Sequence, residues 1–510
     1  MTVLGKWAPR AAALAAGVAA GLAHPPFGLL PGLLGYAVLL HLLDGRDRPS
    51  AFFRAWLAGV GYFAVGVSWV VEPFMVDAEN QGWMAPFALV LMAGGLAVFW
   101  GLAGLLYRAL KPRGIGRVLV FAGCLGGFEW LRGHVFTGFP WNLAGETWAA
   151  GSAPSQAAAY VGAYGLTWIT VALAAAPQLL IRRQSRLAGA LVTVLGLAAL
   201  YGLGAWRLHT APPTPGGPPL IRIVQANIDQ KEKWRPENLE WIFQTYVDLS
   251  RSVGNAPPLV VWPEGALPVV INDFIAPDSP YAARLRDAVA PGQTLLMGVN
   301  RAEAGPDGKA RYFNSLMAFH REPDGLRIVA VYDKHRLTPF GEFLPFGELA
   351  TRIGLRSLVH MPDDFTAGAP PKPISIPGAP LVQPLICYEA LFPGLTGHVA
   401  QASGARPKWI LNISNDAWFG ATSGPLQHLN IASYRAIEQG LPIVRSTPTG
   451  VSAVIDANGR VLLSFGLGRA GVMDMPLPPA LEPTLYSHLG DRLFALMLAA
   501  SALPLLFRRR

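Results

Sequence analysis

The sequence is poor in charged residues and in cysteine. Only 14% of its 510 residues are charged and 52% are hydrophobic, whereas ordinary soluble proteins carry about 25% charged residues. The chain is therefore predicted to be largely embedded in a membrane. Its two cysteines, Cys124 and Cys387, are too few for a disulfide framework, and no Cys/His cluster has zinc-site spacing. We expect neither a metal nor a cofactor.

The sequence contains eight long apolar blocks, which account for much of its hydrophobic content. The eight blocks are Ala11–Ala23, Leu29–Leu43, Ala55–Val71, Pro86–Tyr107, Val118–Trp130, Ala157–Ile181, Leu187–Trp206 and Leu493–Phe507. A helix needs roughly 20 apolar residues to cross the hydrocarbon core. The fourth, sixth and seventh blocks reach that length, and the first, second and fifth reach it only with their flanks. We predict an α-helical bundle of about eight transmembrane helices: seven spans in residues 1–207 and one, with a basic tail, in residues 490–510.

The net charge of +9 follows a topological pattern. Basic residues gather in alternate loops: Lys6, Arg10, Arg46, Arg48, Arg54, Arg108, Lys111, Arg113, Arg117, Arg182, Arg183, Arg186 and Arg508–Arg510. The opposite loops carry Glu72, Asp77 and Glu79, with Arg132 as their one basic residue. The positive-inside rule then places both termini in the cytoplasm. Because topology explains the basic excess, no nucleic-acid partner is expected.

Residues 218–478 are predicted to form a domain outside the cytoplasm. Pro/Gly-rich linkers, "HTAPPTPGGPP" and "MPLPPALEP", bound the region. Between them, apolar strands such as "PLVVW" and "PKWILNIS" alternate with helical patterns such as "GPLQHLNIASYRAIEQG", and "SAVIDANGRVLLSF" is typical of a hairpin. Continuous apolar strands alternating with helices indicate an α/β layered domain.

Three chemically distinct residues each end an apolar strand of this domain. Glu264 follows "LVVWP", Lys334 follows "IVAVYD" and Cys387 follows "VQPLI". Taken singly, they fit a cap, a solvated strand end and a small buried hydrophobe. Strand ends in α/β sheets commonly share one rim, where ligands bind, so a carboxylate, an ammonium and a thiol recurring there suggest a site.

The three groups make chemical sense together. A free thiol has a pKa near 8.5, so only a few per cent is thiolate at neutral pH. A carboxylate can take the thiol proton during attack, and an ammonium can stabilise the thiolate and the oxyanion that follows. The thioester formed can pass its acyl group to water or to an amine.

These motifs carry a resemblance that runs nearly end to end. "WPE", "YDKHRLTPFGEFLP" and "ICYE" resemble the Glu-Lys-Cys motifs of the nitrilase superfamily. Together with the apolar blocks, and with "EWLRGHVFTGFPWN" between the fifth and sixth, the chain resembles the apolipoprotein N-acyltransferase family. Further matches are Trp234 in "KEKW", Glu342 in "FGEF", Tyr388 and Glu389 after the cysteine, and "SNDAWFG".

The resemblance implies an αββα nitrilase-like sandwich in the periplasm, on a multi-pass base in the bacterial inner membrane. It implies transfer of an acyl chain from a phospholipid resembling phosphatidylethanolamine to the N-terminal S-diacylglyceryl cysteine of a lipoprotein. Carried over, Cys387 is the nucleophile, Glu264 the general base and Lys334 the oxyanion stabiliser. Glu342 would orient the lysine or assist proton transfer, while Tyr388 and Glu389 would support the pocket.

Two further segments suggest contact with lipid. Residues 336–366 form a long connection rich in apolar side chains, including Phe340, Phe343 and Leu344, which indicates a hydrophobic lid or arm, or a satellite core. Glu129 and Arg132 stand at i, i+3 spacing at a membrane boundary. They fit either a snorkelling ion pair or recognition of a phospholipid headgroup near Trp141.

Two rival functions stay open on the sequence alone. In a membrane-tethered nitrilase-type amidase, water would take the acyl group, and the triad does not separate hydrolysis from transfer because both share the thioester. A soluble substrate, however, needs no membrane spans. A transporter with an extracytoplasmic domain would carry ionisable residues inside its spans, and these spans are nearly free of charge.

Overall fold

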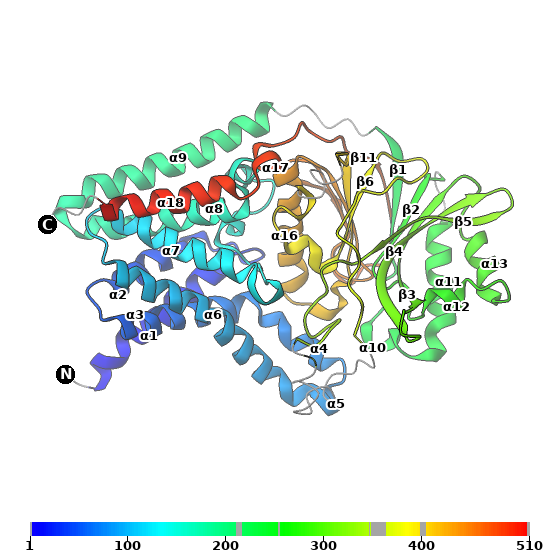
Figure 1. Ribbon diagram of the computed structural model, residues 1–510, viewed down its shortest axis with the longest axis horizontal. Helices are drawn as coiled ribbons and strands as arrows, with labels where there is room; N and C mark the ends of the chain where they lie inside the picture. Colours follow the sequence, from blue (N-terminus) through cyan, green and yellow to red (C-terminus); the bar gives the residue numbers. More distant parts are fainter. Residues whose placement is uncertain are drawn as a thin grey trace. The chain divides into compact units, whose positions relative to one another are not determined.

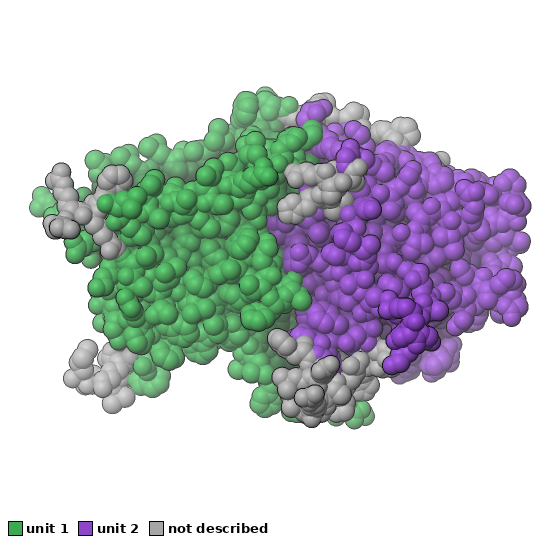
Figure 2. Space-filling model, in the orientation of Figure 1, with its two compact units in different colours: residues 1–212, 422–439, 483–510 green, residues 213–421, 440–482 purple. Residues whose placement is uncertain are grey.

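The computed structural model describes residues 3–210, 217–252, 256–345, 347, 364–397 and 404–506. The chain divides into two compact units, coloured separately in Figure 2. The first comprises residues 1–212, 422–439 and 483–510, and the second comprises residues 213–421 and 440–482. Each unit is therefore assembled from segments that are distant in the sequence.

The first unit is helical (Figure 1). Its α-helices are α1 (Val3–Leu22), α2 (Gly35–Leu43), α3 (Arg48–Gly66), α4 (Glu72–Met75), α5 (Ala78–Gln81), α6 (Ala85–Leu110), α7 (Gly116–Arg132), α8 (Ala158–Ala175), α9 (Arg186–Thr210), α16 (Gly424–Gln439), α17 (Leu485–Leu489) and α18 (Arg492–Leu506). Small residues allow close packing between helices: a Cβ at Gly17 of α1 would lie 1.8 Å from the carbonyl oxygen of Ala58 in α3.

Three helical segments among the described residues are long and apolar enough to cross a membrane. They are Ala78–Leu110, Pro154–Ile181 and Arg183–Thr210, which correspond to the fourth, sixth and seventh apolar blocks. Counting the bent pair Arg48–Gly66 and Ser68–Met75 as one span gives four. Helices α7 and α18 have 17 and 15 residues, which is short for a span. The bundle of eight spans thus stays a prediction.

Helix α16 belongs to the first unit, although the sequence suggested a helix of the α/β domain. Its Tyr434 hydroxyl donates to the carbonyl oxygens of Gly145 and Trp148 at 2.9 and 2.6 Å. Its Arg435 contacts Glu438 at 2.8 Å and Glu146 at 3.6 Å, all three buried. Buried charges persist only when they are paired, so this network ties α16 to the loop around Glu146.

The second unit contains two β-sheets. The six-stranded sheet has the order β11-β1-β2-β3-β4-β5 and the five-stranded sheet the order β10-β9-β8-β7-β6. The strands are β1 (Gly217–Gln225), β2 (Leu259–Trp262), β3 (Thr294–Ala304), β4 (Ala310–Glu322), β5 (Gly325–Asp333), β6 (Val382–Ile386), β7 (Trp409–Ile413), β8 (Ile443–Ser446), β9 (Ala453–Ile455), β10 (Val461–Ser464) and β11 (Gly471–Leu477). β1, β2 and β3 run parallel, as do β6, β7 and β8.

Alternating side chains explain why strands of the six-stranded sheet are buried on both faces. In β2, Leu259 and Val261 join a core shared with β6, β7 and β8, whereas Val260 and Trp262 join a core shared with α11 (Leu239–Ser250). The helices α12 (Ile271–Phe274) and α13 (Pro280–Asp287) add to that second core. The two sheets therefore pack face to face, and helices cover the outer face of the larger one (Figure 1).

Candidate active site

The three residues expected at strand ends meet in the second unit. Lys334 Nζ is 3.4 Å from Glu264 Oε1 and 2.8 Å from Glu342 Oε2. Glu264 and Lys334 follow strands of the six-stranded sheet, and Cys387 follows β6 of the other sheet. Both charges act electrostatically on the Cys387 thiol: Glu264 raises its pKa and Lys334 lowers it. Packing of the two sheets thus brings a carboxylate, an ammonium and a thiol together.

Close backbone packing fixes the position of Glu264. A Cβ on Gly298, in the neighbouring strand β3, would lie 2.4 Å from the Pro263 carbonyl oxygen and 2.5 Å from Glu264 Cα. No side chain fits there, so only glycine permits this approach. Gly265, the next residue, has φ +53°, in the left-handed region, and turns the chain directly after the carboxylate.

The backbone of Cys387 is strained. Its φ is +48°, a left-handed conformation that residues other than glycine rarely adopt and that recurs at functional sites. Cys387 opens the 3₁₀-helix η11 (Cys387–Leu391) directly after the buried strand β6. The thiol-bearing residue is partly exposed, whereas Tyr388 and Glu389 beside it are buried. This sharp turn therefore presents one reactive side chain from an otherwise buried segment.

Burial and charge decide the resting protonation states. Burial raises the pKa of the Cys387 thiol to about 12, the Glu264 carboxylate adds to the rise, and Lys334 and a hydrogen bond with Ser414 oppose it. Burial alone would lower the pKa of Lys334, but Glu342, Glu264 and Cys387 outweigh burial and raise that pKa above its ordinary value. The site therefore rests as a neutral thiol beside a charged ammonium, and the thiol needs a base.

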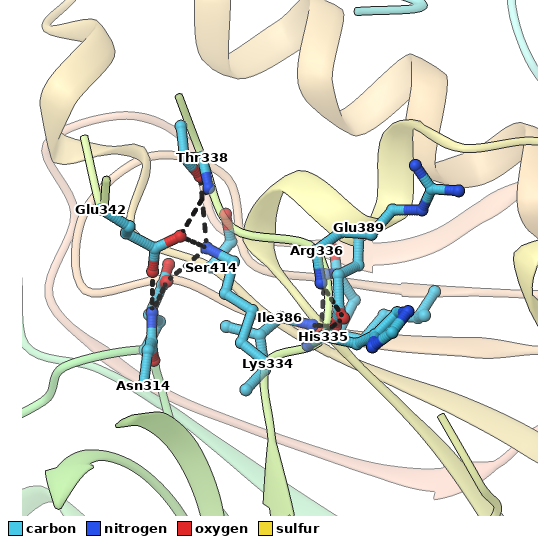
Figure 3. Close-up of polar contacts among 12 residues, drawn as sticks. Asn314, Lys334, His335, Arg336, Thr338, Glu342, Ile386, Glu389 and Ser414 are labelled. Carbon is cyan, nitrogen blue, oxygen red and sulfur yellow. Dashed lines mark hydrogen bonds and ion pairs between the residues drawn. The ribbon is translucent and has the colours of Figure 1, made fainter. Parts of the chain in front are cut away.

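Asn314 and Thr338 complete the cluster. Asn314 Nδ2 donates to Glu342 Oε1 at 2.6 Å (Figure 3). It also donates to Glu264 Oε1 at 2.7 Å and so bridges the two carboxylates. The Thr338 amide donates to Glu342 Oε2 at 2.7 Å, and the Thr338 hydroxyl accepts from Lys334 at 3.3 Å. Sequence reasoning missed both residues. The available signal for Asn314 was a single amide within the apolar strand "YFNSLMAF".

Glu389 holds two strand ends together. Its carboxylate accepts from the Tyr332 hydroxyl at 2.8 Å and from the amides of Ile386, His335 and Arg336 at 2.8, 2.9 and 3.2 Å (Figure 3). Burial raises the pKa of Glu389 above its ordinary value, although these hydrogen bonds act to lower it. The amides belong to the segments that carry Lys334 and Cys387, so Glu389 fixes the spacing between them.

Trp234 is exposed, and its neighbour Lys233 is the residue that interacts with Glu264. Trp234 follows the short helix α10 (Gln230–Lys233), and 52% of its surface is accessible. The buried Lys233 places its Nζ 5.7 Å from the centre of the Trp234 ring. Burial lowers the pKa of Lys233 to about 8, and the Glu264 charge opposes that shift. Lys233 thus contacts the Trp234 ring and interacts electrostatically with Glu264.

Tyr388 is buried, with its ring edge-on to Phe392 at 5.1 Å between ring centres.

Glu129, Arg132 and Trp141 lie in the first unit, all buried. Glu129 accepts from Trp100 Nε1 at 2.6 Å and pairs with Arg132, which also donates to the Phe139 carbonyl oxygen. Trp141 Nε1 donates to Gly66 O at 3.1 Å and to Gln427 Oε1 at 3.0 Å. This is a buried pair with protein partners, not a snorkelling one. Headgroup recognition by these residues stays a prediction.

Other expectations concern metals and the apolar arm. Among the described residues, no group of three or more His, Cys, Asp or Glu side chains is placed to hold a metal ion. Of the arm, Phe340 is 66% exposed and Leu344 is buried. Residues 346 and 348–363 lie outside the described part of the chain, so the lid or arm stays a prediction.

Comparison with known proteins gives the family. Residues 16–176 match the Apolipoprotein N-acyltransferase N-terminal domain and residues 220–481 match Carbon-nitrogen hydrolase. The Apolipoprotein N-acyltransferase of Caulobacter vibrioides is 54% identical over 508 residues, covering 97% of this chain and 94% of that protein. The one from Bradyrhizobium diazoefficiens is 38% identical over 525 residues, covering 99% and 95%. The chain belongs to the apolipoprotein N-acyltransferase family.

Membership makes the chain an acyltransferase enzyme with a nitrilase-like domain, and its apolar helices indicate a bacterial membrane protein. Among solved structures, an amidase from Nesterenkonia sp. is 22% identical, covers 55% of this chain and 96% of its own, and has a TM-score of 0.36. The family assignment does not depend on that likeness.

Proposed function

We propose that this enzyme moves an acyl chain from a membrane phospholipid to the α-amino group of the N-terminal S-diacylglyceryl cysteine of a lipoprotein, through a thioester on Cys387. One observation carries the proposal. Cys387 is a partly exposed residue on a strained turn, and its thiol feels the charges of Glu264 and Lys334, which form a buried cluster with Glu342. A nucleophile and a base within reach of each other are the requirement for acyl-enzyme chemistry.

Glu264 acts as the general base in the first half-reaction. Because the pKa of Cys387 is raised to about 12, thiolate is scarce at neutral pH, and the proton must leave as sulfur attacks the ester carbonyl of the phospholipid. The Glu264 carboxylate accepts this proton: its Oε1 already accepts from Asn314 and Lys334, whereas its buried Oε2 has no hydrogen-bond partner among the described residues. The same carboxylic acid then returns a proton to the departing lysophospholipid oxygen.

Lys334 stabilises the oxyanion of the tetrahedral intermediate. An ammonium has three N–H donors, and in the resting cluster these are directed to Glu342 at 2.8 Å, Thr338 at 3.3 Å and Glu264 at 3.4 Å. The contact with Glu264 is the longest. When Glu264 takes the thiol proton it loses its charge, its hold on Lys334 weakens, and that N–H becomes available for the new oxyanion.

Glu342, Asn314 and Glu389 position these groups. Glu342 makes the shortest contact with Lys334, and Asn314 bridges Glu342 to Glu264. Glu389 holds the two strand ends. Trp234, which is exposed, and Tyr388, which directly follows the nucleophile, contact substrate or support the pocket. In the second half-reaction the lipoprotein amine attacks the thioester and Glu264 takes the amine proton. The C–S bond breaks, and Glu264 returns that proton to the departing Cys387 sulfur.

The membrane arrangement belongs to the same proposal. We place eight spans in the bacterial inner membrane, both termini in the cytoplasm and the catalytic domain, residues 218–478, in the periplasm. The distribution of basic residues between alternate loops supports this topology. The donor is a phospholipid resembling phosphatidylethanolamine.

Incubation with phospholipid alone tests the mechanism. A thioester should form on Cys387 without an acceptor, seen by intact mass spectrometry as a gain of one acyl chain that hydroxylamine removes. Addition of a diacylglyceryl-cysteine peptide should discharge it faster than water does. An active preparation that carries no adduct would overturn the covalent mechanism, and discharge by water at the same rate would favour an amidase.

A further inference from the structure

Ser414 lies next to the nucleophile in the five-stranded sheet. Strands β6 and β7 run parallel with Ile386 opposite Ile413, so Cys387 and Ser414 hold equivalent positions just past the ends of neighbouring strands. Such strands lie about 4.8 Å apart. The Ser414 side chain is also one of the groups that oppose the rise in the pKa of the Cys387 thiol. Nothing in the mechanism above uses this hydroxyl.

The Ser414 hydroxyl is held by a buried ion pair. Its Oγ donates to Asp416 Oδ1 at 2.8 Å. Arg445 Nη2, from strand β8, donates to the two oxygens of Asp416 at 2.9 and 2.7 Å. Arg445 also donates to the side-chain oxygen of Asn412. Ser414 and Arg445 are fully buried and Asp416 is 1% exposed, so the hydroxyl has a fixed position.

A hydroxyl has one proton and two acceptor lone pairs. In the resting site, the proton of Ser414 points to Asp416, which leaves a lone pair free to accept the S–H of Cys387. Once that thiol proton has passed to Glu264, the sulfur carries negative charge and becomes an acceptor. The hydroxyl can then rotate from Asp416 to the sulfur, while Asp416 keeps both hydrogen bonds from Arg445.

We propose that Ser414 is a catalytic hydrogen-bond partner of Cys387, which accepts from the thiol at rest and donates to the thiolate when it forms. No proton leaves Ser414 in this exchange; only the direction of one hydrogen bond changes. Both half-reactions pass through a negatively charged sulfur, first as the nucleophile and then as the leaving group of thioester aminolysis. Ser414 therefore acts in both. The inference rests on the proposed function.

The test compares Ser414→Ala with Ser446→Ala. Ser446 is also fully buried, lies on neighbouring strand β8 opposite Ile413, and its hydroxyl has no hydrogen-bond partner among the described residues. Three rates are measured in each purified enzyme: thioester formation from phospholipid, discharge to a diacylglyceryl-cysteine peptide, and alkylation of Cys387 by iodoacetamide at fixed pH. A hydrogen bond to a charged group accounts for about a ten- to a hundredfold change in rate.

We expect all three rates to fall by about that factor in Ser414→Ala and to stay within about twofold of wild type in Ser446→Ala. Equal behaviour of the two variants would overturn the inference. The inference would also fail if Ser414→Ala slowed acyl transfer but left the alkylation rate unchanged. Ser414 would then not stabilise the thiolate, and the slower transfer would reflect a structural defect. Cys387→Ala, measured alongside, separates the proposals: if it retained turnover, the proposed function itself would fail.

Discussion

Both units of this molecule bury carboxylates against cations, and two of these clusters differ in what else they hold. In the first unit, Glu129 pairs with Arg132 and also accepts from the indole of Trp100, while Arg132 also donates to the carbonyl oxygen of Phe139. In the second, Glu264 and Glu342 share Lys334, whose contact with Glu264 is 3.4 Å.

The two clusters differ in whether a cation can give up one of its contacts to a reacting group. The pair in the first unit hydrogen-bonds to an indole and a backbone carbonyl oxygen, and neither is a nucleophile. The cluster in the second unit has a long, weak contact between Lys334 and Glu264, and both charges act on the thiol of Cys387, a residue with a strained backbone. Buried charge alone thus does not identify an active site. A buried charge whose partner can be exchanged for a reacting group does.

Replacing the nucleophile should have the largest effect. Cys387→Ala removes the group that we propose forms the acyl-enzyme, and we expect acyl transfer to fall by at least about 10⁴-fold. The matched control is Cys124→Ala, which alters the other cysteine, buried in α7, and should leave the rate near wild type. Comparable losses in both variants, measured by peptide acylation, would contradict the assignment.

Lys334→Met tests whether the exchangeable cation serves the transition state. We expect thioester formation to slow by about 10²–10³-fold, the cost of losing one oxyanion donor, with donor KM changed less than kcat. Lys231→Met, an exposed lysine on α10, is the control. A rate near wild type for Lys334→Met would remove this residue from the site.

The raised pKa of Cys387 gives a pH test. A pKa of about 12 means that the thiolate fraction rises about tenfold for each pH unit below that value. Alkylation of Cys387 by iodoacetamide should therefore increase about a hundredfold between pH 7 and pH 9 without levelling, whereas a free cysteine levels near its pKa of about 8.5. A plateau below pH 8 would show a stabilised thiolate and no need for a base.

The positions of Glu264, Lys334 and Cys387 could be predicted because each directly follows an apolar strand. Their partners could not. Asn314 is in mid-strand, and its two acceptors are 50 and 28 residues away. Such long-range contacts leave no local pattern in a single sequence.

Two strands escaped prediction for the same reason. β8, "IVRS", contains a buried arginine that is tolerated only because Asp416 neutralises it. β11, "GVMDMPL", contains Asp474, which pairs with Arg222 of β1, and Pro476, which does not fit an interior strand. Pairing at a sheet edge permits both. The place of α16 in the first unit likewise depends on contacts with Glu146, nearly three hundred residues away in sequence.

Glu342→Gln should have a smaller effect than loss of the lysine. The amide keeps the shape of the side chain but places an NH₂ group among three donors, from Lys334, Asn314 and the Thr338 amide. Losing one charged hydrogen bond predicts a fall in kcat of about ten- to a hundredfold. Glu322→Gln, on a partly exposed carboxylate in β4, is the control and should be silent. Parity between the two would mean that Glu342 does not hold Lys334.

Arg132→Gln should have the smallest effect on the rate of acyl transfer. It tests whether the Glu129–Arg132 pair is structural, in contrast to the cluster around Lys334. Removing one partner of a buried ion pair costs about 3–5 kcal/mol of stability, so the melting temperature should fall. The rate of thioester formation for each folded molecule should stay within about twofold of wild type, because Arg132 pairs with Glu129 and Phe139 in the first unit. Replacing the pair together, as Glu129→Leu with Arg132→Met, should recover much of the lost stability. If the donor KM rose instead in the folded enzyme, with little change in stability, the buried pair would be engaging phospholipid and the contrast between a permanent and an exchangeable ion pair would fail.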